Sequence, residues 1–174
     1  SENRKPIAFP DSQTDPVNHL SVTTSHPKWL IARWLQRYGF DETQALCNAN
    51  NTQPALTIRP NTLRTTADTL HKQLADEDIE AQPSEPNLLT VYKVNHLFKT
   101  QAYHNGLFTV QGPGAARVIQ LLDPQPGETI LDMCSAPGGK TTAIAEYTQD
   151  QSFIVATDLY LGRLKTLAQN IHRL

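Results

Sequence analysis

Apolar residues at helical spacing dominate the first part of the chain. They predict a helix that ends at Gly39 and a second helix that follows through about Ala49. The apolar stripe of the first helix comprises Trp29, Leu30, Trp34 and Leu35. The preceding stretch, residues 1–24, is polar, contains prolines and shows no periodicity. We therefore expect a polar linker or extended arm over residues 1–24 and a helical pair over residues 25–51.

The middle of the chain switches to short strand patterns. Three segments predict strands: Ala55 to Arg59, Ile79 to Ala81 and Leu88 to Tyr92. A segment starting at Thr65 or Thr66 predicts a helix between the first two strands. This β-α-β-β order predicts a small α/β module over residues 52–111, similar to a degenerate RNA-recognition fold.

The module gives only a weak nucleic-acid signal. Aromatic side chains that could stack on bases are sparse, and the candidates are Tyr92, Phe98 and Tyr103. Basic residues could contact phosphate, but scattered surface charge is the favoured alternative. These basic residues are Arg59, Arg64, Lys93 and Lys99. The formal charge of the whole chain is −2 at pH 7, so the chain lacks the net positive charge that is typical of nucleic-acid-binding proteins.

The last third predicts the opening of a parallel sheet. An apolar strand over Glu128 to Leu131 leads into the turn Cys134-Ser-Ala-Pro-Gly-Gly-Lys140, and a helical stretch follows through Thr148. A second apolar strand, Phe153 to Asp158, ends in a carboxylate and precedes an amphipathic final helix. Strand, helix and strand in this order favour a Rossmann-like α/β domain over residues 112–174.

The turn is the strongest candidate for a ligand site. Gly138 and Gly139 let a ligand approach the main chain closely, and a helix N-terminus presents backbone amides. Asp158 follows about twenty residues later, the spacing at which a carboxylate meets a ribose hydroxyl pair in nucleotide-binding sheets. The turn departs from G-x-G-x-x-G, so a ligand with a single adenosine is favoured over a dinucleotide.

Two alternatives compete at the turn. Gly139-Lys140-Thr141 has the ending of a phosphate-binding loop, but Cys134 stands where that motif requires its first glycine. A strand–helix turn without any ligand is the second alternative. Taken alone, Asp158 is typical of an N-cap for the helix that follows it.

The turn, the preceding Asp132 and the later Asp158-Leu-Tyr-Leu-Gly-Arg163-Leu resemble the Sun-type RNA cytosine carbon-5 methyltransferases. The resemblance extends upstream to three segments in the family's order: Ser25 to Leu30, Pro54 to Asn61 and Gly106 to Gln111. It is greatest to the bacterial members that act on 16S ribosomal RNA. Two positions depart from the family pattern, because Ser135 replaces an alanine and Gly112 stands where aspartate is common.

The resemblance implies S-adenosylmethionine as methyl donor and RNA, here 16S ribosomal RNA, as partner. It places the methionine part and the adenosine on the main chain of the turn and the ribose on Asp158. The implied cofactor-binding residues are Cys134, Ser135, Ala136, Pro137, Gly138, Gly139, Lys140, Asp158 and Arg163.

The resemblance also implies that this chain carries no catalytic residue. Family members use two cysteines in Pro-Cys motifs, whereas the cysteines of this chain, Cys47 and Cys134, do not follow proline. We therefore expect a fragment of an RNA cytosine-5 methyltransferase that is inactive by itself. A non-catalytic RNA-binding or assembly module is the alternative.

Composition and the arrangement of residues limit the location and the partners of the protein. Two cysteines suit a reducing cytosol, which favours a cytoplasmic protein. The six histidines show no metal-ligand spacing, so we expect no metal site. No segment approaches the roughly eighteen consecutive apolar residues of a membrane span, so we expect no membrane partner. A Rossmann-like sheet with only two strands would expose an edge, so we also expect self-association through that edge.

Overall fold

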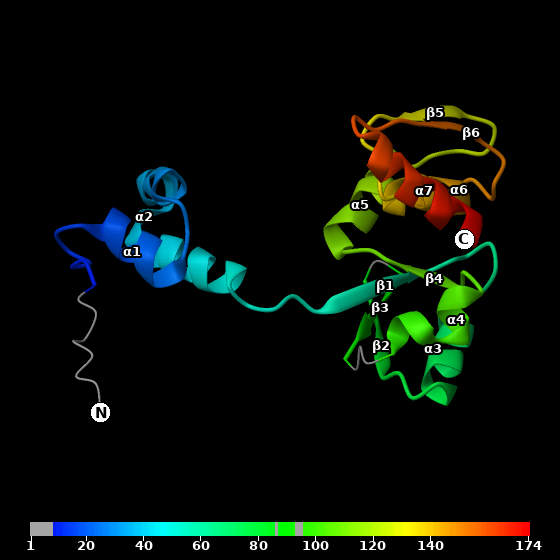
Figure 1. Ribbon diagram of the computed structural model, residues 1–174, viewed down its shortest axis with the longest axis horizontal. Coiled ribbons are helices and arrows are strands. Elements are labelled where there is room, and N and C mark those ends of the chain that lie inside the picture. Colours follow the sequence, from blue (N-terminus) through cyan, green and yellow to red (C-terminus); the bar gives the residue numbers. More distant parts are fainter. Residues whose placement is uncertain (1–8, 86, 93–95) are drawn as a thin grey trace. The chain divides into compact units, whose positions relative to one another are not determined.

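The computed structural model describes residues 9–85, 87–92 and 96–174, and the chain divides into two compact units, Ser1–Pro54 and Ala55–Leu174 (Figure 1). Within the described residues, the first unit consists of helices α1 and α2. The second unit contains a four-stranded antiparallel sheet followed by a two-stranded parallel sheet. The fold is therefore mixed α/β, as the sequence predicts.

The first unit corrects the expectation of an arm over residues 1–24. Helix α1 spans Pro16–Thr24. Asp15 caps it by accepting a hydrogen bond from the amide of Asn18 at 3.2 Å, and proline suits the first helical position. Leu20 is fully buried in the core of this unit. A nine-residue helix with so few buried positions gives too little periodicity for a sequence pattern to reveal it. The first eight residues of the expected arm lie outside the described residues.

Helix α2 spans Lys28–Asn50 and bends at Gly39, whose backbone leaves the helical region with φ 78° and ψ −178°. The predicted break between two helical segments is thus confirmed. The two helices share a core of Leu20, Ile31 and Cys47, edged by Val17, Trp34, Leu35 and Phe40. Trp29, which the stripe places in the core, is instead 66% exposed.

The second unit opens with a βαββαβ module. Its elements are β1 (Leu56–Pro60), α3 (Ala67–Asp76), β2 (Ala81–Ser84), β3 (Leu88–Val91), the 3-10 helix η1 (Leu97–Lys99), α4 (Gln101–His104) and β4 (Phe108–Val110). The strands form an antiparallel sheet in the order β2-β3-β1-β4. This topology confirms the predicted small α/β module with an RNA-recognition-like arrangement. The sequence patterns do not predict α4 and β4, because four and three residues are too few to show a period.

The core of the module lies between its sheet and its helices. Ile58 of β1, Leu89 of β3 and Phe108 of β4 are fully buried in one cluster with Leu70 and Leu74 of α3. Helix α3 starts where the sequence predicts, because its N-cap, Thr66, accepts a hydrogen bond from the amide three residues on at 3.2 Å. Side chains on the opposite face of the sheet are available to contact the rest of the unit.

Helix α5 leads from the module into the parallel sheet. The elements are α5 (Pro113–Leu122), β5 (Thr129–Asp132), α6 (Gly139–Tyr147), β6 (Phe153–Ala156) and α7 (Leu161–Arg173). Strands β5 and β6 pair in parallel, with Leu131 opposite Val155. Ile130 and Ile154 pack on a buried cluster of α5 and α6 residues. The predicted strand–turn–helix–strand opening of a Rossmann-like sheet is confirmed.

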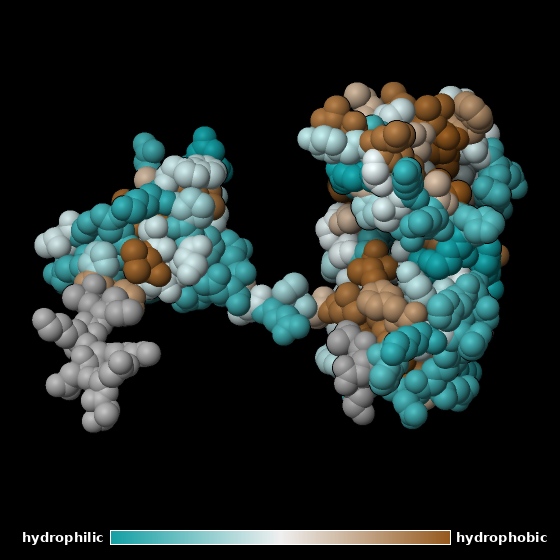
Figure 2. Space-filling model, in the orientation of Figure 1, coloured by the Kyte–Doolittle hydropathy of each residue, from teal (hydrophilic) through white to brown (hydrophobic). Residues whose placement is uncertain are grey.

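The other face of β5 and β6 is apolar and exposed. Strand alternation places Leu131, Phe153 and Val155 on it, and their exposed fractions are 58%, 68% and 39%. Figure 2 shows apolar residues gathered at this end of the unit. A contiguous apolar face of this kind marks a surface that another polypeptide segment can cover.

Within the described part of the chain, every helix is too short or too polar to cross a membrane.

Candidate cofactor-binding site

The turn between β5 and α6 is fixed by hydrogen bonds to its neighbours. Ser135 donates twice to the carbonyl of Thr157, from its amide at 3.0 Å and from its hydroxyl at 2.8 Å. The amide of Gly138 donates to the carbonyl of Ser135 at 2.7 Å. Asn170 of α7 donates to the carbonyl of Pro137 at 2.8 Å. The turn is thus tied both to the segment after β6 and to the last helix.

Gly138 occupies a position that suits only glycine. Its φ of +108° lies in the region that residues with a Cβ rarely adopt. A Cβ built there would lie 2.8 Å from Cδ1 of Leu167, which is buried in α7. The close approach of α7 to the turn therefore depends on the missing side chain.

The first turn of α6 offers unpaired donors. Among the described residues, the amides of Gly139, Lys140 and Thr141 have no hydrogen-bond acceptor. Such amides carry the partial positive charge of a helix N-terminus and bind carboxylates and phosphates. This end of α6 can therefore hold an anionic group of a ligand.

Asp158 lies beside the turn, as the sequence predicts, but its carboxylate already has partners. Its side chain is only 2% exposed. It accepts hydrogen bonds from the amides of Ala136 and Tyr160, both at 3.3 Å, and from Arg163 at 3.4 Å. Arg163 also donates to the carbonyl of Ala136 at 2.9 Å. Asp158 thus holds the N–H of Ala136 and Arg163 holds its C=O, and Asp158 also supports the start of α7.

Asp132 anchors the other end of the turn. Its carboxylate accepts a hydrogen bond from the hydroxyl of Thr141 at 2.7 Å and one from the amide of Cys134 at 3.3 Å. Cys134 itself is exposed, and Cys47 is buried in the other unit. Asp132 thus links the end of β5 to the first turn of α6.

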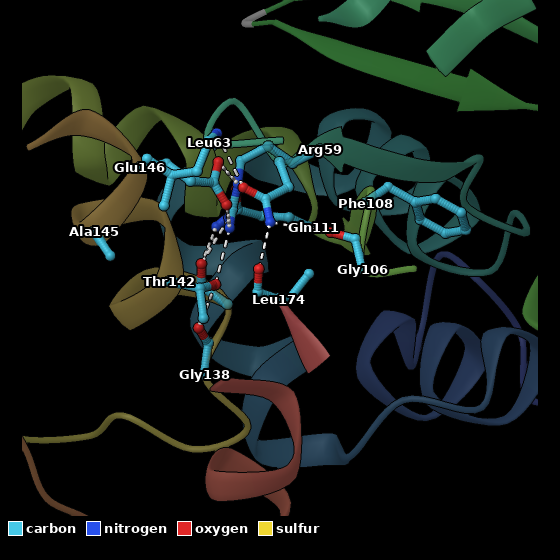
Figure 3. Close-up of polar contacts among 12 residues, drawn as sticks. Arg59, Leu63, Gly106, Phe108, Gln111, Gly138, Thr142, Ala145, Glu146 and Leu174 are labelled. Atoms are coloured by element: carbon cyan, nitrogen blue, oxygen red, sulfur yellow. Dashed lines mark hydrogen bonds and ion pairs between the residues drawn. The ribbon is translucent and has the colours of Figure 1, made fainter. Parts of the chain in front are cut away.

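A buried ion pair lies directly behind the turn (Figure 3). Arg59 of β1 donates to both carboxylate oxygens of Glu146 in α6, at 2.7 and 2.9 Å. Its remaining donors reach Gln111 at 2.6 Å, the carbonyl of Gly139 at 2.7 Å and the hydroxyl of Thr142 at 2.9 Å. All five N–H donors of the guanidinium are therefore used.

Burial raises the pKa of the Glu146 carboxyl above its ordinary value, and the hydrogen bonds and charge of Arg59 oppose that rise. The opposition between desolvation and pairing is expected for a carboxylate this well buried. The pair is thus stable only as a unit, because either partner alone would leave an unpaired buried group.

The structure corrects one interpretation of the basic residues in the module. Arg59 can neither contact phosphate nor count as surface charge, because it is buried in the ion pair with Glu146. Arg64 donates to the carbonyl of Asn105 at 2.8 Å. Lys93 lies outside the described residues.

All nine predicted site residues lie together, in the turn and at the start of α7. The sequence analysis missed Arg59, Gln111 and Glu146, which support the turn from behind. Two features of the sequence point to this support. A charged residue, Arg59, lies inside a predicted strand, and the spacing of Thr142 and Glu146 places both on one face of α6.

A separate cavity lies along α6, and Thr141 and Thr142 of the first turn of this helix form part of its wall. It has a volume of about 590 Å³ and is lined by residues that include Asn61, Arg64, Ala145, Ile154 and Leu174. None of the nine predicted site residues contributes to its wall. The cofactor prediction therefore concerns the open turn and not this cavity.

An amide-presenting turn after the first strand of a parallel sheet, beside a carboxylate that follows the next strand, is the arrangement of a Rossmann-like domain. Residues 26–93 match the family of RsmF/B-like methyltransferase ferredoxin-like domains, and residues 119–174 match the 16S rRNA methyltransferase RsmB/F family. Together the two segments cover more than half of the chain. The chain belongs to this RsmB/F methyltransferase family.

Curated relatives agree with this assignment. The chain is 31% identical over 176 aligned positions to the probable ribosomal RNA small subunit methyltransferase B of Bacillus subtilis, covering 100% of this chain and 39% of the relative. It is 38% identical over 154 positions to ribosomal RNA small subunit methyltransferase B of Yersinia pseudotuberculosis, covering 86% of this chain and 35% of the relative. The chain thus spans less than two fifths of the length of these relatives.

Solved structures share the fold. A methyltransferase homologue from Pyrococcus horikoshii superposes with a TM-score of 0.81 at 24% identity, covering 92% of this chain and 53% of that one. NSun6 from the same organism, solved with SFG, superposes with a TM-score of 0.77 at 20% identity, covering 85% and 62%. At these identities the likeness concerns the fold alone.

Proposed function

We propose that this chain is the cofactor-binding part of an S-adenosylmethionine-dependent RNA methyltransferase that acts on carbon-5 of a cytosine in 16S ribosomal RNA. The observation that carries the proposal is the turn from Cys134 to Lys140, which is fixed on both sides and presents unpaired amides at the N-terminus of α6. The relatives named methyltransferase B favour ribosomal RNA as substrate. A ribosomal RNA substrate in turn favours the cytoplasm.

The turn fits S-adenosylmethionine, a donor of an electrophilic methyl group. The unpaired amides of Gly139, Lys140 and Thr141 suit its carboxylate. Asp158 suits its ribose hydroxyls, but only once Arg163 moves aside. That contact, at 3.4 Å, is the longest of the three on Asp158, and the Arg163 side chain is exposed. We infer that Arg163 is displaced when the ribose binds.

The first prediction concerns cofactor affinity. We expect the chain to bind S-adenosylmethionine weakly, with a Kd above about 1 μM, because polar ligand groups without partners reduce affinity. Asp158→Ala should weaken binding at least about tenfold, since a hydrogen bond to a charged group contributes roughly 1.5–3 kcal/mol. Isothermal titration calorimetry measures both. The control is Asp76→Ala, an exposed carboxylate at the end of α3. Submicromolar binding that Asp158→Ala leaves unchanged would refute the assignment.

The second prediction concerns catalysis. We expect no methyl transfer from this chain to any RNA, because neither Cys47 nor Cys134 follows a proline and Cys47 is buried. Incubation with S-adenosylmethionine and RNA containing 5-fluorocytosine traps the covalent complex that an active enzyme would form. We expect no trapped complex on a denaturing gel. A band that survives Cys47→Ser but disappears with Cys134→Ser would show that the exposed cysteine is a nucleophile after all.

The third prediction concerns self-association. Within the described residues, β5 and β6 pair only with each other, and one face of this pair is apolar and exposed. Pairing with a second copy would satisfy the backbone groups at the edges and cover the apolar area. We expect the sedimentation coefficient to rise with concentration, and Phe153→Lys to suppress the rise. Trp29→Lys changes an equally exposed apolar residue in the other unit and serves as control. Concentration-independent sedimentation of the unmodified chain would contradict the proposal.

A further inference from the structure

At strands β1 and β4, the helix-free face of the four-stranded sheet is buried and polar. Arg59 of β1 pairs with Thr109 of β4. Thr57 precedes Arg59 by two residues in β1, and its hydroxyl donates at 2.6 Å to the carbonyl of Gln111, which follows the end of β4. All four are buried, with exposed fractions between 4% and 8%. In RNA-recognition folds the same face stacks bases on aromatic side chains. Here the polar side chains of this face form hydrogen bonds with α6 inside the same unit.

Two side chains from this face converge on a single atom of the turn. The carbonyl oxygen of Gly139 accepts hydrogen bonds from Arg59 at 2.7 Å and from the Gln111 side chain at 3.0 Å. Gly139 is the first residue of α6 and carries one of the unpaired amides. That carbonyl shares its peptide plane with the unpaired amide of Lys140, so the module fixes the orientation of one of these donors.

The same arginine also controls the neighbouring peptide through Thr142. Arg59 donates to the hydroxyl of Thr142 at 2.9 Å, and that hydroxyl donates to the carbonyl of Gly138 at 2.8 Å. The carbonyls of both glycines are thus held, one directly and one through a single side chain. Glycine peptides have the largest conformational freedom in a chain, so this constraint is where an external support has the most effect.

We propose that Arg59 and Gln111 are positioning residues of the cofactor site: the small α/β module orders the Gly138–Gly139 turn and thereby sets the affinity for S-adenosylmethionine. Glu146 contributes by holding the guanidinium in place through two hydrogen bonds. None of these three residues is among the residues that we expect to touch the cofactor. The claim that the module orders the turn rests on the hydrogen bonds alone. The claim that this order sets the cofactor affinity rests on the proposed function.

The test separates ordering of the turn from general stability. Arg59→Met combined with Glu146→Leu removes both buried charges in volume-conserving steps, which cores often tolerate. Hydrogen exchange of the Gly138 and Thr142 amides, which donate within the turn, reports local order without any ligand. We expect their protection to fall at least about tenfold. The amide of Thr148, at the far end of α6, is the internal control and should keep its protection.

Calorimetry with S-adenosylmethionine tests whether the order of the turn sets the cofactor affinity. The double variant should bind at least about tenfold more weakly than the unmodified chain, at a temperature where both are folded. Arg64→Met, which removes an arginine from the following loop, should leave the affinity within about twofold. If the double variant fails to fold, Arg59→Lys takes its place. Lysine keeps a cation beside Glu146 but lacks the planar fork that reaches Gly139, so it should also weaken binding.

Each outcome is decisive for one of the two claims. Unchanged protection of Gly138 and Thr142 in a folded variant overturns the inference, whether or not the cofactor binds. Lost protection with unchanged affinity overturns the link to the cofactor. An unmodified chain that shows no binding contradicts the proposed function, and the exchange experiment still decides whether Arg59 orders the turn.

Discussion

Arg59→Ala is expected to lower the free energy of unfolding by about 3–5 kcal/mol, because it leaves a buried carboxylate without its partner. The Glu146 side chain, which is 5% exposed in the unmodified chain, would lose both hydrogen bonds to the guanidinium. The side chain of Gln111 and the hydroxyl of Thr142 would lose a partner as well. Denaturant unfolding followed by circular dichroism measures the change.

The structure offers a matched control for this substitution. Arg117 and Glu85 form an ion pair at 3.9 Å whose side chains are 64% and 91% exposed. Exposed pairs contribute about 0–1 kcal/mol, so Arg117→Ala should change stability little. Similar losses for Arg59→Ala and Arg117→Ala would show that the buried pair is not the support that we describe.

Gly138→Ala is expected to destabilise the second unit by at least about 2 kcal/mol, since strain at positive φ and overpacking each cost roughly 1–3 kcal/mol. The added Cβ would meet Leu167 at 2.8 Å in a backbone conformation of φ +108°. Because α7 would have to shift, the substitution should also abolish measurable cofactor binding. Thermal unfolding and calorimetry on the same variant check both effects.

Gly162→Ala is the control for this effect. Gly162 lies in the first turn of α7, and a Cβ there would meet nothing within 4 Å. Alanine is favoured over glycine in helices by roughly 0.8–1.0 kcal/mol, so this substitution should be neutral or stabilising. A destabilisation of Gly162→Ala equal to that of Gly138→Ala would contradict the packing argument.

Sequence patterns predict the parts of this fold that depend on local chemistry. The turn follows from its glycines, the start of α3 from Thr66, and the break in α2 from Gly39, because each acts within a few residues of its own position. Adjacent parallel strands end on the same edge, so the meeting of Asp158 with the turn is also predictable. The ligand role of these residues is still a prediction.

Other features depend on contacts that no local pattern encodes. Arg59 and Glu146 lie 87 residues apart, so a strand arginine gives no sign that its partner is in a later helix. Leu20 makes α1 a core helix only because α2 folds back on it. Trp29 belongs to the apolar stripe of α2 but is exposed, because the stripe is wider than the surface that α1 covers.

The most direct test of the central claim is to locate the cofactor on the chain by nuclear magnetic resonance. Titration of the isotope-labelled chain with S-adenosylmethionine should shift the amide signals of Gly138, Gly139 and Lys140 first and most. Signals of residues around the separate cavity, such as Asn61 and Ala145, should stay in place. Shifts confined to that cavity, or no shifts at millimolar cofactor, would contradict the account.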